Sequence, residues 1–186
     1  MSLNLFCPLS LVVAFMLFGN SFLYAQSQGF AGTWRFDESS SRNVAAAFES
    51  GDVRCELHII PEGSNRMVIE DLADTYVGWR KTELNVDLNG PESTSVWPKG
   101  DLPSFSFEAV AIGRDQVVKT KAVEGKDRSA FDLTSYFKVL VSQGTYNIVL
   151  RSHYQLSANG DTLTVTETRN SREYNEPAVY VFQRVK

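Results

Sequence analysis

The strongest constraint on the fold is an alternation of apolar and polar residues between positions 131 and 169, interrupted by two short turn sequences, Gln143-Gly144 and Asn159-Gly160. A period of two predicts strands, and a two-residue turn fixes which residues face each other across a hairpin. The second turn predicts the pairs Leu156 with Leu163, Tyr154 with Val165, Ser152 with Glu167, and Leu150 with Arg169. The first predicts Val141 with Tyr146, Val139 with Ile148, Phe137 with Leu150, Ser135 with Ser152, and Leu133 with Tyr154. Both turns place apolar residues on one face, so the sequence predicts an antiparallel meander with one buried face.

The alternation continues back to Gly32, with Gly, Asn, Pro and Asp at the breaks. The predicted strands are 32–37, 53–60, 66–77, 79–88, 104–112, 116–123, 131–141, 145–156, 161–169 and 178–185. An antiparallel sheet of about 8–10 strands tends to close, so we expect an all-β, up-and-down barrel, with a two-sheet sandwich as the alternative. A barrel of this size can hold a ligand cavity. Within the first long connection, serines followed by Val44-Ala-Ala-Ala-Phe48 predict one short helix. It would form a lid over the mouth or cover an exposed edge.

The first 25 residues carry no charged side chain and include the apolar run from Leu11 to Phe18. This pattern is typical of a secretory signal peptide, with cleavage expected after Ala25. Residues 26–186 would then form one exported domain, either periplasmic or secreted. The alternative is a retained membrane anchor, although the run is shorter than the roughly 20 apolar residues that a spanning helix needs.

The composition narrows the classes of partner. A formal charge of -4 gives no basic field for nucleic acid. After signal cleavage the chain keeps one cysteine, Cys55, so no internal disulfide is expected. Stability must therefore come from packing.

Two motifs resemble those of the lipocalin-like (calycin) proteins, and most of all small exported bacterial lipocalin-like domains. They are Phe30-Ala-Gly-Thr-Trp-Arg-Phe-Asp37 and Ser157-Ala-Asn-Gly-Asp-Thr-Leu-Thr-Val165. In that family the first strand begins with Gly-x-Trp, and an arginine from the end of the barrel packs across the tryptophan. The resemblance implies that Gly32 and Trp34 hold these motif positions, with Arg184 as the partner that helps to close the barrel floor. An antiparallel pairing of the last strand with the first would also bring Arg184 to Trp34. The alternative is a buried tryptophan without a special partner.

The resemblance further implies a small hydrophobic or amphipathic ligand in the cup of the barrel. The alternation predicts the candidate lining: Val53, Cys55, Leu57, Phe137, Tyr146, Ile148, Leu150, Ser152, Tyr154, Glu167 and Arg169. Most of these side chains are of types that also form ordinary cores. Glu167 and Arg169 are the unusual members, because a buried carboxylate must be paired, protonated or solvated. They would either anchor a ligand or form a structural ion pair.

Two other classes of function remain as alternatives. An enzyme is disfavoured because His58 and His153 fall on the outer face and Cys55 has no evident base. We therefore expect no catalytic residues, no cofactor and no metal site. A structural or protein-interaction module would use the connection 89–103, in which an exposed Trp97 could anchor a partner, unless it folds back onto the barrel floor.

Overall fold

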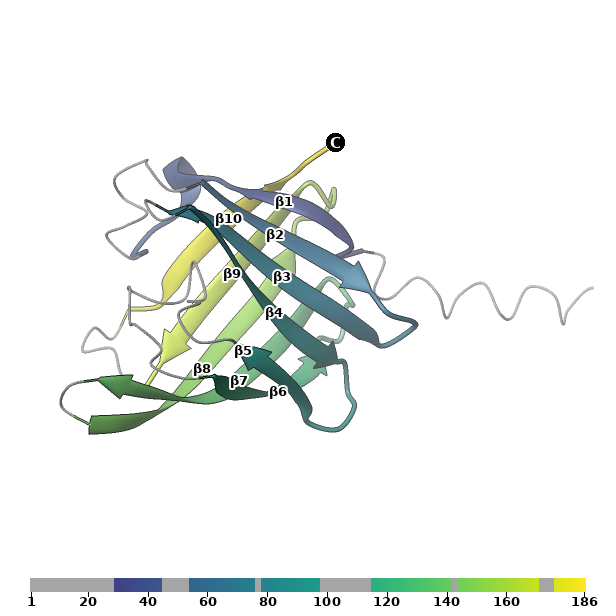
Figure 1. Ribbon diagram of the computed structural model, residues 1–186. Coiled ribbons are helices and arrows are strands. Elements are labelled where there is room, and N and C mark those ends of the chain that lie inside the picture. Colours follow the sequence, from purple (N-terminus) through teal and green to yellow (C-terminus); the bar gives the residue numbers. More distant parts are fainter. Residues whose placement is uncertain (1–28, 45–53, 76–77, 98–114, 142–143, 171–175) are drawn as a thin grey trace, which may run out of the picture.

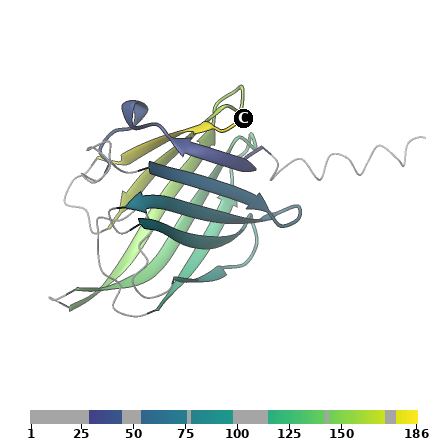
Figure 2. The same cartoon turned by 45° about the horizontal axis from the view of Figure 1, so that its top comes forward.

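Ten antiparallel strands form one sheet in the computed structural model, which describes residues 29–44, 54–75, 78–97, 115–141, 144–170 and 176–186. Figure 1 shows the sheet curling into a nearly closed barrel, and Figure 2 gives a second view of it. The strands are β1 (Gly32–Phe36), β2 (Arg54–Pro61), β3 (Arg66–Thr75), β4 (Gly78–Asp87), β5 (Ser93–Trp97), β6 (Gln116–Glu124), β7 (Ala130–Val141), β8 (Gly144–Leu156), β9 (Thr162–Arg169) and β10 (Ala178–Arg184). The predicted all-β meander is confirmed.

The strand order is β4-β3-β2-β1-β10-β9-β8-β7-β6-β5, so consecutive strands pair with each other, except β4 with β5, and the first strand also pairs with the last. Trp34 is opposite Arg184 in the pairing of β1 with β10. The two edges of the sheet, β4 and β5, meet across a seam bridged mainly by side chains of Asn85, Ser95 and Thr120. Ser95 Oγ accepts from Asn85 N at 2.7 Å, and Thr120 Oγ1 donates to Asn85 O at 2.7 Å. A parallel bridge between Leu88 and Ala122 completes the seam.

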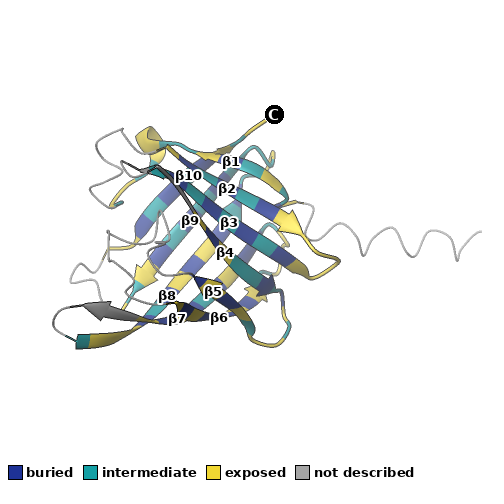
Figure 3. Ribbon diagram, in the orientation of Figure 1, coloured by how far each residue is buried: buried dark blue, intermediate teal, exposed yellow. Residues whose placement is uncertain are grey.

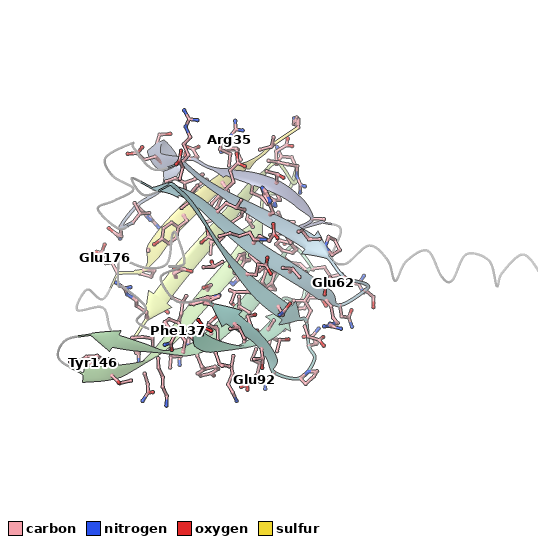
Figure 4. The ribbon with its side chains drawn as sticks, in the orientation of Figure 1. Arg35, Glu62, Glu92, Phe137, Tyr146 and Glu176 are labelled. Carbon is pink, nitrogen blue, oxygen red and sulfur yellow. The ribbon has the colours of Figure 1, made fainter. Side chains whose placement is uncertain are left out.

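One end of the barrel, here called the closed end, is formed by the turns 62–65, 88–92, 125–129 and 157–161 together with the start of β1 and the end of β10. Hydrogen bonds join these turns to the rest of this end: Leu88 N donates to Asn65 O at 2.7 Å, and Leu156 N donates to Ser129 O at 2.8 Å. In Figure 4, Glu62 and Glu92 lie at the closed end, whereas Tyr146 and Glu176 lie at the opposite end.

The interior is divided into two apolar clusters, because alternate residues of each strand point inward. Figure 3 shows the resulting bands of buried positions across the sheet. The larger cluster includes the closed end, with Phe30, Trp34 and Phe131 fully or almost fully buried. The smaller cluster comprises Trp97, Val118, Phe137, Ile148 and Leu150.

The β8–β9 hairpin has the predicted register, with Leu156 opposite Leu163 and Ser152 opposite Glu167. The predicted register of the β7–β8 hairpin is wrong by two residues: Val141 pairs with Gly144 and Phe137 pairs with Ile148. A shift of two preserves the faces. It also brings Phe131 opposite Tyr154, and their rings stack with centroids 4.4 Å apart. This aromatic pair favours the observed register.

One other element prediction differs from the structure, and two lie wholly or mostly outside the described residues. Ser93–Trp97, predicted as part of a loop, is strand β5, whereas the predicted strand 104–112 lies outside the described residues. In the first long connection, the described helix is a single 3-10 turn, Glu38–Ser40, capped by the Asp37 side chain. The predicted helix Val44–Phe48 lies outside the described residues except for Val44, which packs against the core. Among the described residues, no helix has the length and apolar character needed to cross a membrane.

Candidate functional site

A small internal cavity of about 20 Å³ lies inside the barrel, where the two apolar clusters meet. Its apolar wall consists of Ile69, Leu84, Trp97, Leu133 and Leu150. Its polar wall consists of Asp71, Thr82, Ser135, Ser152, Tyr154 and Glu167. We call these six residues the polar layer. A layer of this kind is costly in a barrel interior unless its groups have partners, so it is the strongest candidate site in the described structure.

One side of the polar layer comes from β3 and β4. Asp71 shares its face of β3 with Met67 and Ile69, and it lies directly opposite Thr82 of β4. The carboxyl group is almost fully buried, and Cys55 Sγ lies 3.5 Å from Asp71 Oδ1. A thiol can donate a weak hydrogen bond to a carboxylate. The Cys55 thiol therefore contacts the Asp71 carboxylate from the side of the larger apolar cluster.

The other side of the polar layer comes from β7, β8 and β9. Ser152 of β8 is opposite Glu167 of β9, and its hydroxyl donates to Glu167 Oε1 at 2.9 Å. Ser135 of β7 is on the same inner face, diagonal to Ser152, because Leu133 is directly opposite Ser152. Glu167 is 4% exposed, so its environment is the barrel interior and not bulk water.

Tyr154 links the two sides of the polar layer. Burial raises the pKa of the Tyr154 phenol well above its ordinary value, and the charges of Glu167 and Asp71 raise it further. The carboxylates of Glu167 on β9 and Asp71 on β3 therefore both raise the pKa of the same phenol. At neutral pH Tyr154 is a neutral group that can donate or accept a hydrogen bond.

The Ser135 hydroxyl is the one polar atom of the cavity wall whose bonding is visibly incomplete. Ser135 is 1% exposed, and its Oγ has no hydrogen-bond partner within the described structure. Leaving a buried hydroxyl unsatisfied costs about 1–3 kcal/mol. A group occupying the cavity would recover that free energy.

The structure places the predicted lining residues in several environments. Leu150, Ser152, Tyr154 and Glu167 line the cavity. Four others are buried nearby: Cys55 and Leu57 in the larger cluster, and Phe137 and Ile148 in the smaller. Arg169 is opposite Leu150 and partly buried, and its predicted pairing with Glu167 stays a prediction. Val53 lies outside the described residues.

Tyr146 is a correction, because it is 50% exposed and does not line the cavity. By alternation along β8, Tyr146 lies on the same face as Ile148, which points inward. However, β8 pairs with β9 only from Leu150 onward. The tip of the β7–β8 hairpin therefore projects beyond the body of the barrel, as Figures 1 and 4 show. A side chain at that tip has no opposite wall to pack against.

Sequence reasoning missed two contributors to the site. Asp71 is absent from the predicted lining, but it points inward; its alternation with Met67, Ile69 and Ala73 was the signal that could have identified it. Trp97 was considered as an exposed anchor or as folded onto the barrel floor. Instead it is 2% exposed on β5, lines the cavity and donates its Nε1 hydrogen to Glu83 O at 3.1 Å.

At the closed end, Trp34 is fully buried and the guanidinium Cζ of Arg184 lies 4.0 Å from its ring centroid. The contact expected from chain direction is thus present. Arg184 also donates to the carbonyl oxygens of Gly29, Ala31 and Gly160 at 2.7, 2.6 and 2.8 Å. Gly32 has a φ of +134°, and a Cβ there would lie 2.9 Å from Arg184 Nη1. These contacts make the closed end a structural plug.

The histidines lie outside the barrel. His58 is within 3.4 Å of Glu70 and 3.6 Å of Glu56, and His153 Nδ1 is 2.7 Å from Asp132. These are contacts on the outer face between partly or largely exposed side chains. In the part of the chain that the structure describes, no group of three or more His, Cys, Asp or Glu residues could hold a metal ion.

Solved structures with similar folds are β-barrels. A mutant of the fluorescent protein UnaG aligns with a TM-score of 0.51 and 16% identity, covering 85% of this chain and 97% of that chain. Secretory abundant heat soluble protein 4 from Ramazzottius varieornatus gives a TM-score of 0.47 and 14% identity, covering 85% and 96%. A redesigned β-barrel, mFAP1, bound to DFHBI gives a TM-score of 0.38 and 12% identity, covering 86% and 98%. The sequence matches no protein-family model and no curated protein.

The fold and the site together define a nearly closed antiparallel β-barrel with a polar layer buried in its interior. At 16% identity the likeness to UnaG concerns the fold alone. The chemistry of the interior must therefore be argued from this chain's own residues.

Proposed function

We propose that this protein is an exported, non-catalytic barrel that binds a small amphipathic molecule in its interior. The observation that supports the proposal most strongly is the cavity, whose wall is apolar on one side and polar on the other. Ligand sites commonly combine an apolar lining with a few convergent polar groups. The apolar part of the molecule would lie toward Trp97, Leu84 and Leu150, and its polar group would contact the polar layer.

Export is proposed from the N-terminal sequence, and it fits the lipocalin-like motifs that the chain shares with small exported bacterial domains. The stability of the protein and its ligand site both depend on the packed barrel.

Native mass spectrometry of protein purified from its own host tests the proposal directly. The expected result is a species heavier than the bare chain, which loses the added mass when the protein is denatured.

Two substitutions on one strand provide the matched comparison. Ser135→Leu fills the cavity and should weaken retention of the added mass in native mass spectrometry, with an affinity at least tenfold lower, about 1.4 kcal/mol. Thr134→Leu adds the same side chain at the adjacent position, which points to the other face of β7, and should leave binding unchanged. Equal effects of the two substitutions, or an absence of any added mass on the parent protein, would contradict an interior site.

A further inference from the structure

Exposed apolar side chains gather on strands β5 to β8, which lie on the side of the barrel away from β1 (Figure 1). The described structure has seven large apolar residues that are exposed, and five of them belong to these four strands: Val96, Val117, Val123, Tyr136 and Tyr146. The alternation of β6 sets the direction of two of them, because Val118 points inward and Val117 therefore points out. A wet outer face normally carries polar residues at such positions, so barrel packing does not account for these side chains.

Cross-strand pairing joins several of these residues into one group. Val96 is directly opposite Val117 in the pairing of β5 with β6, and Tyr136 is directly opposite Val149 in the pairing of β7 with β8. Lys119, the next outward residue after Val117, is opposite Tyr136, so Val117 and Tyr136 are diagonal neighbours within reach of an aromatic ring. We call Val96, Val117, Tyr136 and Val149 the apolar strip. Single exposed apolar residues are normal, whereas a contiguous group of them marks an interaction surface.

Four exposed cations flank the apolar strip: Lys119, Lys121, Lys138 and Arg151. Lys119 Nζ lies 2.7 Å from Glu92 Oε1. The other three have no ion-pair partner among the residues that the structure describes. Two of them, Lys121 and Arg151, are opposite the same residue of β7, Thr134, in the row next to Tyr136. A chain with a formal charge of -4 therefore carries a local excess of positive charge around its apolar strip.

The outer face of β1 to β4 has a different charge pattern, because its carboxylates are paired. Glu56 Oε1 lies 3.3 Å from Arg35 Nη2, and Glu70 Oε1 lies 3.0 Å from Lys81 Nζ. A second copy of this chain would thus offer carboxylates that already have cationic partners. The unpaired cations favour a different partner, one with anionic groups of its own.

A surface hollow of about 640 Å³ lies over β6, β7 and β8 and connects the strip to its cations. Its wall includes Val117, Tyr136, Val149, Lys119 and Lys138. Asp115 is the one carboxylate among the described residues of the wall. Sites for small molecules commonly have volumes of about 300–1,000 Å³. The hollow is therefore large enough for the headgroup of an anionic lipid, with lysines beside its phosphate and valines beside its apolar part.

We propose that the outer face of β5 to β8 docks onto the surface of an anionic lipid bilayer. The apolar strip would enter the boundary between headgroups and acyl chains, where tyrosine is common. The cations would contact lipid phosphates, because lysine and arginine keep their charged ends in the polar region while their stems cover apolar surface. They are distributed over three strands around an apolar centre, which suits a partner that contacts the whole face at once. This proposal concerns the outside of the barrel and goes beyond a ligand in its interior.

Vesicle flotation tests the proposal with the protein in the form that its host produces. Vesicles of phosphatidylcholine are compared with vesicles in which phosphatidylglycerol replaces part of the phosphatidylcholine. Each basic residue near an anionic surface contributes about fivefold to affinity. We expect binding to the phosphatidylglycerol vesicles to be at least about tenfold tighter, and to weaken as salt is raised, since salt screens exposed charges.

Two double variants with the same loss of charge locate the binding face. Lys121→Gln combined with Lys138→Gln should weaken binding to the anionic vesicles by about tenfold or more. Arg54→Gln combined with Arg66→Gln is the control, because it removes two exposed cations from β2 and β3 and should leave affinity nearly unchanged. All variants keep the N-terminal sequence of the parent, so the apolar run 11–18 cannot cause a difference between them. Circular dichroism checks that each variant keeps the fold.

An environment-sensitive fluorescent label shows which face touches lipid. Val117→Cys and Ile60→Cys each place an exposed thiol on an outer face, on β6 and on β2. Both are made together with Cys7→Ser, and the native Cys55 is 1% exposed, so it is protected from the reagent. On anionic vesicles the emission of the label at position 117 should shift to the blue, and that of the label at position 60 should not.

Several results would overturn the inference. These are equal affinity of the parent for the two kinds of vesicle, equal losses from the two double variants, and equal shifts, or no shift, at positions 117 and 60. Poly-L-glutamate serves as a soluble acidic polypeptide. If it displaces the protein from the anionic vesicles when its carboxylates only match the lipid phosphates in concentration, the face recognises acidic protein and not a bilayer.

Discussion

Trp34 is the residue whose environment is the most completely defined, because it is held by an arginine and by the main chain. Its Nε1 donates to Phe30 O at 2.9 Å, and Arg184 covers its ring. We predict that Trp34→Leu and Arg184→Ala each destabilise the barrel and that the double variant loses less than the sum. The difference should be about 0.5–2 kcal/mol, the value of a cation–π contact. Urea unfolding of the three variants and the parent measures it.

The Arg184→Lys variant separates the stabilisation that comes from the positive charge from the stabilisation that comes from the hydrogen-bond geometry. A lysine keeps a cation near the indole but cannot reach three carbonyls in fixed directions. It should therefore retain only part of the stability that Arg184→Ala loses. Strictly additive losses for Trp34→Leu and Arg184→Ala would show that the two residues do not stabilise each other.

Single residues also show why the candidate site was only partly predictable. Ser152 and Glu167 could be placed opposite each other because Asn159-Gly160 fixes the register of their hairpin. The inward orientation of Asp71 could not be predicted in the same way. The adjacent Glu70 is also acidic, and no two-residue turn fixes which face of the strand each of them lies on. Cavity size and the unsatisfied Ser135 hydroxyl depend on packing between strands far apart in sequence, which no local pattern encodes.

Strand β5 is the element on which barrel closure depends. It pairs with β6 on one side, while on the other side it faces β4 through Asn85 and Ser95 in place of a regular ladder. We predict that Ser95→Ala combined with Thr120→Val accelerates hydrogen exchange of the β5 amides, because each change removes one bond to the Asn85 backbone. Each bond should contribute about 0.5–1.5 kcal/mol to keeping the seam closed.

Hydrogen exchange followed by mass spectrometry compares β5 with β8 and β9 in the same sample. Local opening of the seam predicts faster exchange in β5 and little change in the other two strands. Thr94→Ala is the control, since its side chain is exposed and only its carbonyl contacts Asn85. Equal acceleration in all three strands would mean global destabilisation and would contradict a separable seam.

The strands also show how far element prediction from sequence could go. The regular hairpins were found because alternation and turn residues agree along β8 and β9. Strand β5 was missed since Ser93–Trp97 has only two apolar residues in five and is preceded by Gly90 and Pro91. Its strand geometry comes from pairing with β6, a tertiary effect that overrides weak local preference.

At the scale of the whole molecule, the barrel joins its two ends in sequence through β1 and β10. The plug draws on both ends: Phe30 and Trp34 come from the start of the domain, and Arg184 comes from its last strand. The proposed cleavage after Ala25 would leave this plug intact. Gly29 and Phe30, which supply carbonyl oxygens to Arg184 and Trp34, follow the cleavage site closely.

This arrangement predicts that the unfolding temperature falls abruptly when an N-terminal truncation removes Phe30. Chains that begin at Gln26 and at Gly29 should unfold at nearly the same temperature, whereas a chain that begins at Ala31 should lose both carbonyls and the buried Phe30 ring. That ring packs edge-on against Phe131 at 4.9 Å, and Phe30 is 2% exposed. Loss of a buried phenylalanine costs about 3–5 kcal/mol, which corresponds to roughly 6–20 °C in Tm for a domain of this size. Scanning calorimetry of the three chains measures the step, with Phe30→Ala in the Gln26 chain to separate the ring from the carbonyls. A gradual decline from Gln26 to Ala31, without a step at Phe30, would show that the plug does not depend on the start of the domain.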